Sequence, residues 1–325
     1  MLGNQEDKFM KKFVLIDGNA ILHRAYHALP PLTNKEGVVV NAVYGFFSML
    51  LKIIQDLKSQ YLAVCFDREA PTFRKELYVG YQAKRPKIAE DLVPQIGIVH
   101  EVLEKAKVDI FEVDGYEADD LIGTLANQVQ SSKFKVQSLE TIIVSGDRDM
   151  LQLVNSHVKV LAPVKGITEM ILFDRKKVEE KYGIEPSQFI DYKALVGDSS
   201  DNYPGVAGIG PKTARDLLQK YETFENLYQN LSSLPEKIGK KLATDAEQAA
   251  LAKKLATIVT DAPIKLSLEE CSMTKFSMEG ARSAFEELGF KSLIKRLENK
   301  GTEDKEREQV KNKAGGQKIT QMGLL

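Results

Sequence analysis

The chain has 325 residues, of which 43% are hydrophobic and 28% are charged. This length predicts about two domains, and this composition excludes wholesale disorder. The 45 basic and 46 acidic side chains nearly cancel, so the total charge indicates no polyanionic partner. The two cysteines, Cys65 and Cys271, are far apart and fit neither a zinc motif nor a disulfide framework.

The sequence contains no apolar run of membrane-spanning length. Its opening, MLGNQEDKFMKK, has no hydrophobic core after the charges and does not resemble a signal peptide. With cysteines that suit a reducing compartment, these features predict a soluble cytoplasmic protein without a membrane partner.

The first half of the chain alternates between two patterns. After an extension over residues 1–9, short β-rich apolar runs predict buried strands at 13–16, 61–66, 108–113 and 142–144. Helical periodicity predicts helices between them, at 42–57 and 91–106. The alternation predicts an α/β domain over residues 10–173, with a mainly parallel central sheet flanked by helices.

From residue 174 to about 297 the pattern is helical, and residues 298–325 lack periodicity, which predicts a flexible tail. Within the helical part, Gly208 and Gly210 precede a helix that has Pro211 in its first turn. Such a turn can present N–H groups to a phosphate, with added charge from Lys212. The alternative is an ordinary hairpin of two helices.

Three of the predicted strands run directly into aspartate. The first ends at Asp17, the second at Asp67, and the last is followed by Asp147 and Asp149. One such residue could simply cap a helix or begin a turn. Because the carboxyl ends of parallel strands meet at one edge of a sheet, three of them predict an acidic pocket.

Two further acidic groups extend this set. Glu117, Asp119 and Asp120 open a predicted helix, while Asp198 and Asp201 follow the helix FIDYKALVG. Crowded carboxylates repel one another unless a cation lies among them. Oxygen-only donors suit Mg²⁺, with Mn²⁺ as a substitute, and two such ions can promote phosphodiester hydrolysis.

A local basic excess lies between Arg68 and Lys87, with six basic residues against two acidic ones. Such a segment can hold a polyanion, although an ordinary solvated surface has the same composition.

Four motifs in order resemble the 5′ nuclease domain of bacterial DNA polymerase I, a member of the flap endonuclease family. They are LIDGNAILHRAYHALPPLTN, GYEADDLIGTLA, SGDRDMLQLV and VGDSSDNYPGVAGIGPKTA. The resemblance covers about residues 10–297 and is specific because the motifs occur as a set. It implies a sheet under a helical arch, a helix-three-turn-helix unit that grips duplex DNA, and 5′–3′ exonuclease and flap cleavage in DNA replication and repair.

The resemblance also implies roles for individual residues. One metal cluster would comprise Asp17, Asp67, Glu117, Asp119 and Asp120, and a second would comprise Asp147, Asp149, Asp198 and Asp201. Phosphate near the scissile bond and the arch would be contacted by Arg24, Arg74, Lys84 and Arg85. DNA contacts would come from Tyr81, Gly208, Gly210, Lys212 and Thr213, with K⁺ at the helix-three-turn-helix.

The chain departs from the family pattern in two ways. Gln82 occupies the place of an arch lysine, whose charge Lys84 could supply instead. The sequence stops at Leu325, which predicts a stand-alone nuclease whose DNA polymerase is a separate chain. Its last residues resemble a sliding-clamp-binding peptide, with Gln321, Leu324 and Leu325 as the anchors.

Two other functions are compatible with parts of this pattern. A junction-binding module without catalysis would have the fold, but its acidic residues would be unexplained. An RNA nuclease of the PIN type would lack the GVAGIGPKTA turn, which favours DNA.

Overall fold

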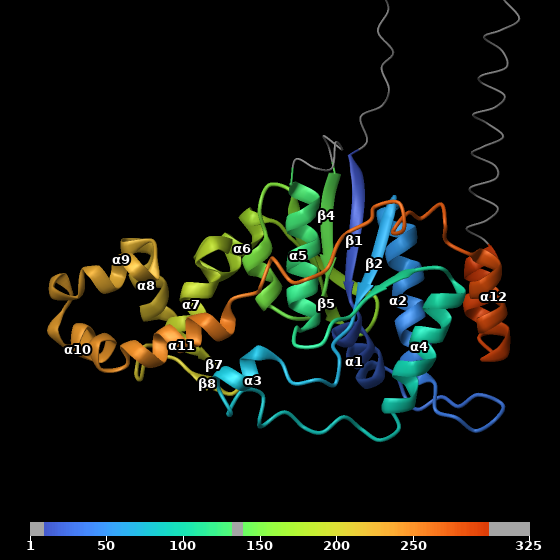
Figure 1. The fold of residues 1–325 in the computed structure, drawn as a ribbon, viewed down its shortest axis with the longest axis horizontal. Helices are drawn as coiled ribbons and strands as arrows, with labels where there is room; N and C mark the ends of the chain where they lie inside the picture. The colour runs from blue at the N-terminus through green and yellow to red at the C-terminus, as the bar shows by residue number, and fades with distance from the viewer. Residues whose placement is uncertain (1–9, 132–138, 299–325) are drawn as a thin grey trace, which may run out of the picture.

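The computed structural model describes residues 10–131 and 139–298. Its centre is a six-stranded sheet of order β3-β2-β1-β4-β5-β6 (Figure 1). The neighbours from β3 to β5 pair in parallel, and β6 pairs with β5 in the antiparallel sense. The strands are β1 (Lys11–Asp17), β2 (Tyr61–Cys65), β3 (Asp109–Phe111), β4 (Leu139–Val144), β5 (Val158–Lys165) and β6 (Glu169–Phe173). The expected mainly parallel sheet is confirmed, and all four predicted strands are present.

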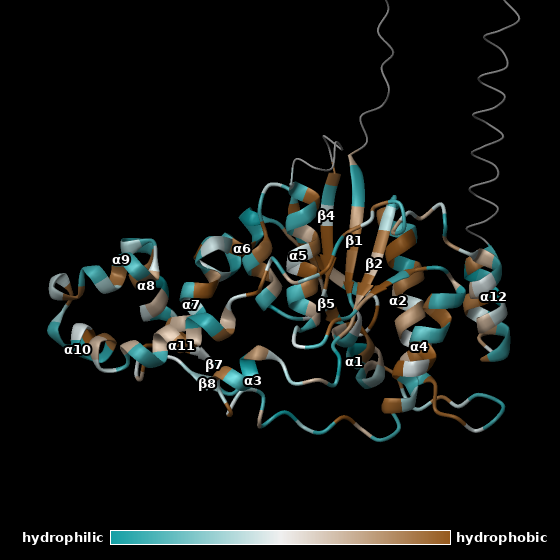
Figure 2. Cartoon of the chain, in the orientation of Figure 1, coloured by the Kyte–Doolittle hydropathy of each residue, from teal (hydrophilic) through white to brown (hydrophobic). Residues whose placement is uncertain are grey.

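Helices cover both faces of this sheet because alternate strand residues point to opposite sides. Phe13 and Leu15 of β1 pack towards α5, whereas Val14 and Ile16 belong to the core that contains α1, α2, α4 and α12. Accordingly, most of the strand residues in Figure 2 have the brown colour of hydrophobic residues. These helices are α1 (Gly18–Ala28), α2 (Asn41–Leu57), α4 (Val93–Lys105), α5 (Ala118–Gln130) and α12 (Met278–Glu287).

A second group of elements extends to one side of the sheet (Figure 1). It contains a small hairpin, β7 with β8, which joins α7 to the glycine turn before α8. Its helices are α6 (Arg175–Tyr182), α7 (Phe189–Val196), α8 (Pro211–Tyr221), α9 (Phe224–Gln229), α10 (Glu236–Thr244) and α11 (Ala246–Ala256). The hairpin strands are β7 (Gly197–Asp198) and β8 (Tyr203–Pro204), and the 3-10 helices of this group are η2 (Pro186–Gln188) and η3 (Leu231–Ser233). A further 3-10 helix, η1 (Asp149–Leu153), lies between β4 and β5 in the chain.

After α11 the chain returns to the sheet. The backbone N–H of Met273 donates to the carbonyl of Gln60 at 2.9 Å, and that of Leu62 donates to Cys271 at 2.8 Å. The helix α12 then packs against α4. The last part of the expected helical region, after about residue 257, therefore lies with the α/β unit in space.

The segment expected to form a helical arch is mostly irregular. It contains only the short helix α3 (Phe73–Leu77), and residues 78–92 then continue as turns and extended chain to α4. Residues 73–92, here called the strap, run past the carboxyl ends of the strands (Figure 1). The helical arch that the resemblance implies is therefore not formed over residues 78–92 in this structure. Among the described residues, no helix is both long and apolar enough to cross a bilayer.

Candidate metal centre and nucleic-acid interface

Asp17 is fixed at the carboxyl end of β1 by two hydrogen bonds. Its Oδ1 accepts from the backbone N–H of Ala20 at 2.9 Å, which caps α1, and its Oδ2 accepts from Ser145 Oγ at 2.6 Å. Burial raises the pKa of Asp17 to about 7, and the neighbouring charges of Asp67 and Asp147 act in the same direction.

Asp67, after β2, reaches the start of α5. Its Oδ1 accepts from the backbone N–H of Ala118 at 2.7 Å, and its own N–H donates to Asn19 Oδ1 at 2.9 Å. These bonds tie two strand ends to a helix N-terminus, where an anionic group is stabilised by the helix dipole.

Asp119, in the first turn of α5, faces the same group. Burial raises its pKa well above the usual range, and the charges of Asp147 and Asp17 raise it further. We call Asp17, Asp67, Asp119 and Asp147 the first cluster. Glu117 lies beside it, held by a hydrogen bond of 3.1 Å from Thr72 Oγ1. Mutual repulsion of this kind favours a cation, and the oxygen donors fit Mg²⁺ or Mn²⁺.

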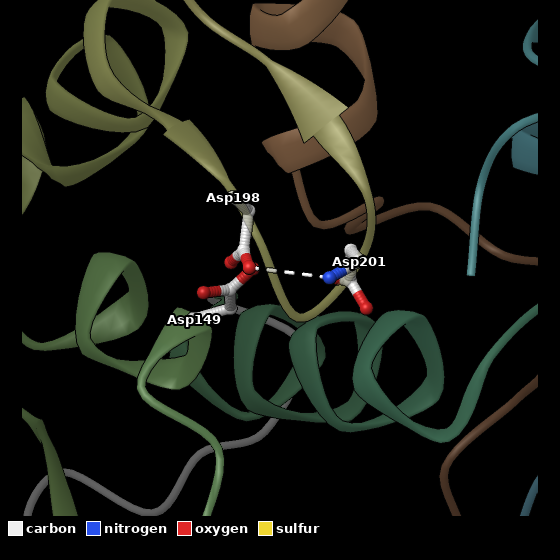
Figure 3. A group of neighbouring side chains, drawn as sticks. All are labelled: Asp149, Asp198 and Asp201. Atoms are coloured by element: carbon white, nitrogen blue, oxygen red, sulfur yellow. Dashed lines mark hydrogen bonds between the residues drawn. The ribbon is translucent and has the colours of Figure 1, made fainter. Parts of the chain in front are cut away.

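Asp149, Asp198 and Asp201 form a second cluster (Figure 3). One carboxylate oxygen of each lies within 4.8 Å of the others, which is close enough to hold one metal ion. Asp149 comes from η1, whereas Asp198 and Asp201 come from β7 and the turn after it. The backbone N–H of Asp201 donates to Asp198 Oδ1 at 3.2 Å. Asp147 was expected in this group. Its charge acts to raise the pKa of Asp119 in the first cluster and of Asp149 in the second.

Lys193 is part of this centre, although the sequence motifs did not identify it. Its Nζ pairs with both Asp149 and Asp198. Burial opposes its charge, but these carboxylates raise its pKa. Conversely, Lys193 outweighs the effect of burial on Asp198 and lowers the pKa of that carboxyl to about 2. The only signal in the sequence was a lysine on the helix just before the GDSSD motif.

Arg74 and Asp120 were expected to contact phosphate and metal, but the structure pairs them with each other. Two hydrogen bonds of 2.7 Å join Arg74 to the two oxygens of Asp120, and the residues are 2% and 0% exposed. Arg74 also donates to the carbonyls of Leu255 and Thr257, each at 2.9 Å. This buried pair joins α3 to α5 and to the end of α11 and the residue after it, and the expected roles of the two residues stay predictions.

The strap contacts both clusters. Arg85 pairs with Asp201 at 2.5 Å, and Tyr81 donates to Glu117 Oε2 at 3.1 Å. Tyr81 is 4% exposed and its ring stacks against Tyr203, so in this structure it is not accessible for the expected contact with DNA. Gln82 has a left-handed backbone, with φ of +57°, and not the helical geometry expected for it.

The remaining basic residues of the set are available at the surface. Lys84 is exposed and Arg85 is half exposed. Arg24, on α1, is half-buried and its Nε donates to the carbonyl of Gly166 at 2.9 Å.

The turn that contains Gly208 and Gly210 is exposed, and hydrogen bonds with other segments hold it in place. Gly208 has φ of +72°, a conformation that favours glycine, and its carbonyl accepts from Lys241 Nζ at 2.8 Å. The backbone N–H of Ala207 donates to Asp245 at 2.7 Å. Gly210 then caps α8, with Lys212 exposed and Thr213 half-buried in the first turn. The predicted helix start is therefore confirmed.

Gln321, Leu324 and Leu325, the predicted clamp-binding residues, lie outside the described residues. The same is true of the extension at residues 1–9 and of the predicted tail from residue 299.

A mainly parallel sheet with acidic clusters at its carboxyl edge, next to a helical unit, defines a PIN-like nuclease architecture. Two family models match the chain. The "5′-3′ exonuclease, N-terminal resolvase-like domain" covers residues 12–183, and the "5′-3′ exonuclease, C-terminal SAM fold" covers residues 184–279. The chain belongs to this 5′-3′ exonuclease family.

Curated relatives agree with this assignment. A 5′-3′ exonuclease of Aquifex aeolicus is 38% identical, and the match covers 89% of this chain and 96% of the relative. DNA polymerase I of Caldicellulosiruptor bescii is 43% identical over 88% of this chain. The chain spans only about a third of that polymerase, namely 33% of its length.

Solved structures support the fold. The T5 D15 protein, co-crystallised with metal ions, aligns with a TM-score of 0.64 at 18% identity, covering 89% of this chain and 98% of T5 D15. The catalytic core of Rad2 in complex with DNA aligns with a TM-score of 0.55 at 15% identity, covering 89% and 92% of the two chains.

Proposed function

We propose that this chain is a structure-specific 5′ nuclease that hydrolyses phosphodiester bonds in DNA by two-metal-ion catalysis with Mg²⁺. The observation that carries the proposal is the second cluster, whose three carboxylates have oxygens within 4.8 Å of one another, beside the electrostatically coupled carboxylates of the first cluster. Its substrates would be 5′ flaps, nicks and 5′ ends, as in replication and repair.

The residues divide the work between them. Asp17, Asp67 and Asp119 with Glu117 would hold one ion, and Asp149, Asp198 and Asp201 would hold the other, with Asp147 close to both. Bound there, Mg²⁺ or Mn²⁺ would activate water and stabilise the departing oxygen. Asp120 would join the first ion only by giving up its pair with Arg74.

Basic groups around the clusters would hold the DNA. Arg85 and Lys84 on the strap, with Arg24 on α1, can contact phosphates near the reacting bond. The glycine turn and Lys212 can hold the duplex by backbone N–H groups and charge, independently of base sequence. A K⁺ ion at this turn would have to replace Lys241 Nζ if it bound the Gly208 carbonyl.

Cleavage of a labelled 5′ flap, with and without Mg²⁺, tests the proposal. We expect short 5′ products in Mg²⁺ or Mn²⁺ and none in excess chelator. A single-stranded RNA of the same sequence serves as the control for the PIN-type alternative. Tight, cation-independent binding without products would instead indicate a junction-binding module.

We further propose that the chain works in the cytoplasm together with a DNA polymerase. A tail that binds the sliding clamp through Gln321, Leu324 and Leu325 would raise its concentration at nicks. Calorimetry of the tail peptide with the cognate clamp tests this part, and absence of binding would remove it.

A further inference from the structure

Lys193 holds the position between two candidate metal ligands. Its side chain is 13% exposed, and its Nζ pairs with Asp149 and Asp198, which come from separate segments of the chain. With Arg85 on Asp201, every carboxylate of the second cluster has a basic partner. The ammonium group of Lys193 therefore occupies the position, between Asp149 and Asp198, where a divalent ion would bind.

The first cluster has no such partner. Within the described residues, no lysine, arginine or histidine forms an ion pair with Asp17, Asp67, Asp119 or Asp147 within 4 Å. Its carboxylates repel one another. Arg85 and His23 act on Asp67 only from beyond ion-pair distance. The two clusters therefore differ before a cation binds, although both consist of carboxylates. Each carboxylate of the second cluster has an ion-pair partner, and those of the first cluster have none within 4 Å.

This difference changes what binding a cation involves. At the first cluster, a divalent ion relieves repulsion without having to displace a directly paired basic side chain. At the second, it must displace or share oxygens with Lys193, whose charge would otherwise remain buried close to the ion. A buried ammonium that loses its partners is strongly unfavourable, so the second cluster should bind a divalent ion more weakly.

We propose that Lys193 is a positioning residue that assembles the second cluster and lowers its affinity for a divalent cation, so that the first cluster fills before the second. This inference rests on the proposed function, because it takes both clusters as cation sites. Lys193 would have this effect without coordinating a metal ion itself.

Calorimetric titration of the full chain with Mg²⁺, without DNA, tests the proposal. We expect two affinity classes in the wild type. In Lys193→Met the weaker class should tighten by roughly tenfold or more, because a competing charge is removed, while the tighter class is unchanged. Lys193→Arg keeps the charge and should keep two separated classes.

Lys253→Met is the matched control. Lys253 also pairs with two carboxylates, Asp191 at 2.7 Å and Glu225 at 2.6 Å, but belongs to neither cluster. Its loss should leave Mg²⁺ binding unchanged. If Lys193→Met does not fold, Lys193→Gln retains a donor for the carboxylates and should show the same tightening.

Unchanged affinities in the neutral Lys193 variants, or loss of the weaker class, would overturn the proposal. These results would leave the proposed function intact, provided that the wild type binds Mg²⁺ and cleaves flaps. A wild type that neither binds Mg²⁺ nor cleaves would refute the proposed function instead.

Discussion

Asp119 and Asp120 are adjacent in the sequence but lie in different surroundings. Asp119 faces other carboxylates, whereas both oxygens of Asp120 accept hydrogen bonds from Arg74. The sequence indicated an acidic site but could not separate these two, because Arg74 is 46 positions from Asp120. Lys193 was missed for a similar reason, since its partner Asp149 lies on a different segment of the chain.

Asp147→Asn should abolish cleavage while DNA binding persists. The substitution removes one negative charge from the first cluster. It keeps an oxygen that can accept the hydrogen bond that the backbone N–H of Asp149 donates to Asp147 Oδ1 at 2.8 Å. We expect single-turnover cleavage of a flap to fall roughly 100-fold or more, with flap affinity equal or tighter. Cleavage near the wild-type rate would contradict the two-metal assignment.

Asp120→Asn should act on stability, because it leaves the Arg74 guanidinium buried without a counter-charge. We expect the free energy of unfolding to fall by about 3–5 kcal/mol, measured by denaturant titration. Asp119→Asn is the matched control: without metal it should be as stable as the wild type or more so, since it relieves repulsion. Equal stability of Asp120→Asn and the wild type would show that the ion pair contributes little.

At the scale of elements, hydrophobic patterns predicted the strands and helices of the α/β unit well. β1 and β4 are buried runs, and α2 carries one apolar face, so their periodicity reflects the core directly. The strap was predicted poorly because it is held by distant partners and not by its own periodicity. Its residue Gln82, for example, donates its backbone N–H to the carbonyl of Asp201 at 2.8 Å.

The glycine turn and the start of α8 form an element whose role can be tested through Lys212. Lys212→Ala should weaken binding to duplex-containing DNA and reduce the slope of log affinity against log salt by about 1, without a change in base preference. Lys220→Ala, at the other end of α8, removes the same charge and should leave the slope unchanged. Identical slopes for wild type and Lys212→Ala would exclude this turn from the interface.

At the scale of the whole molecule, the second cluster joins two parts of the fold. Asp149 follows the central sheet, whereas Asp198 and Asp201 belong to the hairpin of the helical unit. A cation at this cluster would therefore hold the two units together. This connection was not visible in the sequence, where the acidic motifs are separated by almost fifty residues between Asp149 and Asp198.

Millimolar Mg²⁺ should consequently raise the melting temperature, since it binds clustered carboxylates that exist only in the folded chain. Excess chelator should reverse the rise. Calorimetric scans with Mg²⁺, with chelator and with K⁺ at equal ionic strength would separate specific binding from screening. A melting temperature that is the same with Mg²⁺, with chelator and with K⁺ would count against the clusters as cation sites.

The return of the chain to the sheet after α11 has a consequence for how the molecule can be divided. The match to the C-terminal family model ends at residue 279, but Phe285 and Leu293 beyond it are buried in the core that contains α2 and α4. Arg296 adds a hydrogen bond of 2.7 Å to Ser48. In topological terms the helical unit is an insertion with two covalent connections to the α/β unit. A fragment cut at the family boundary would expose an apolar face, so a shortened nuclease has to retain the chain to about residue 298.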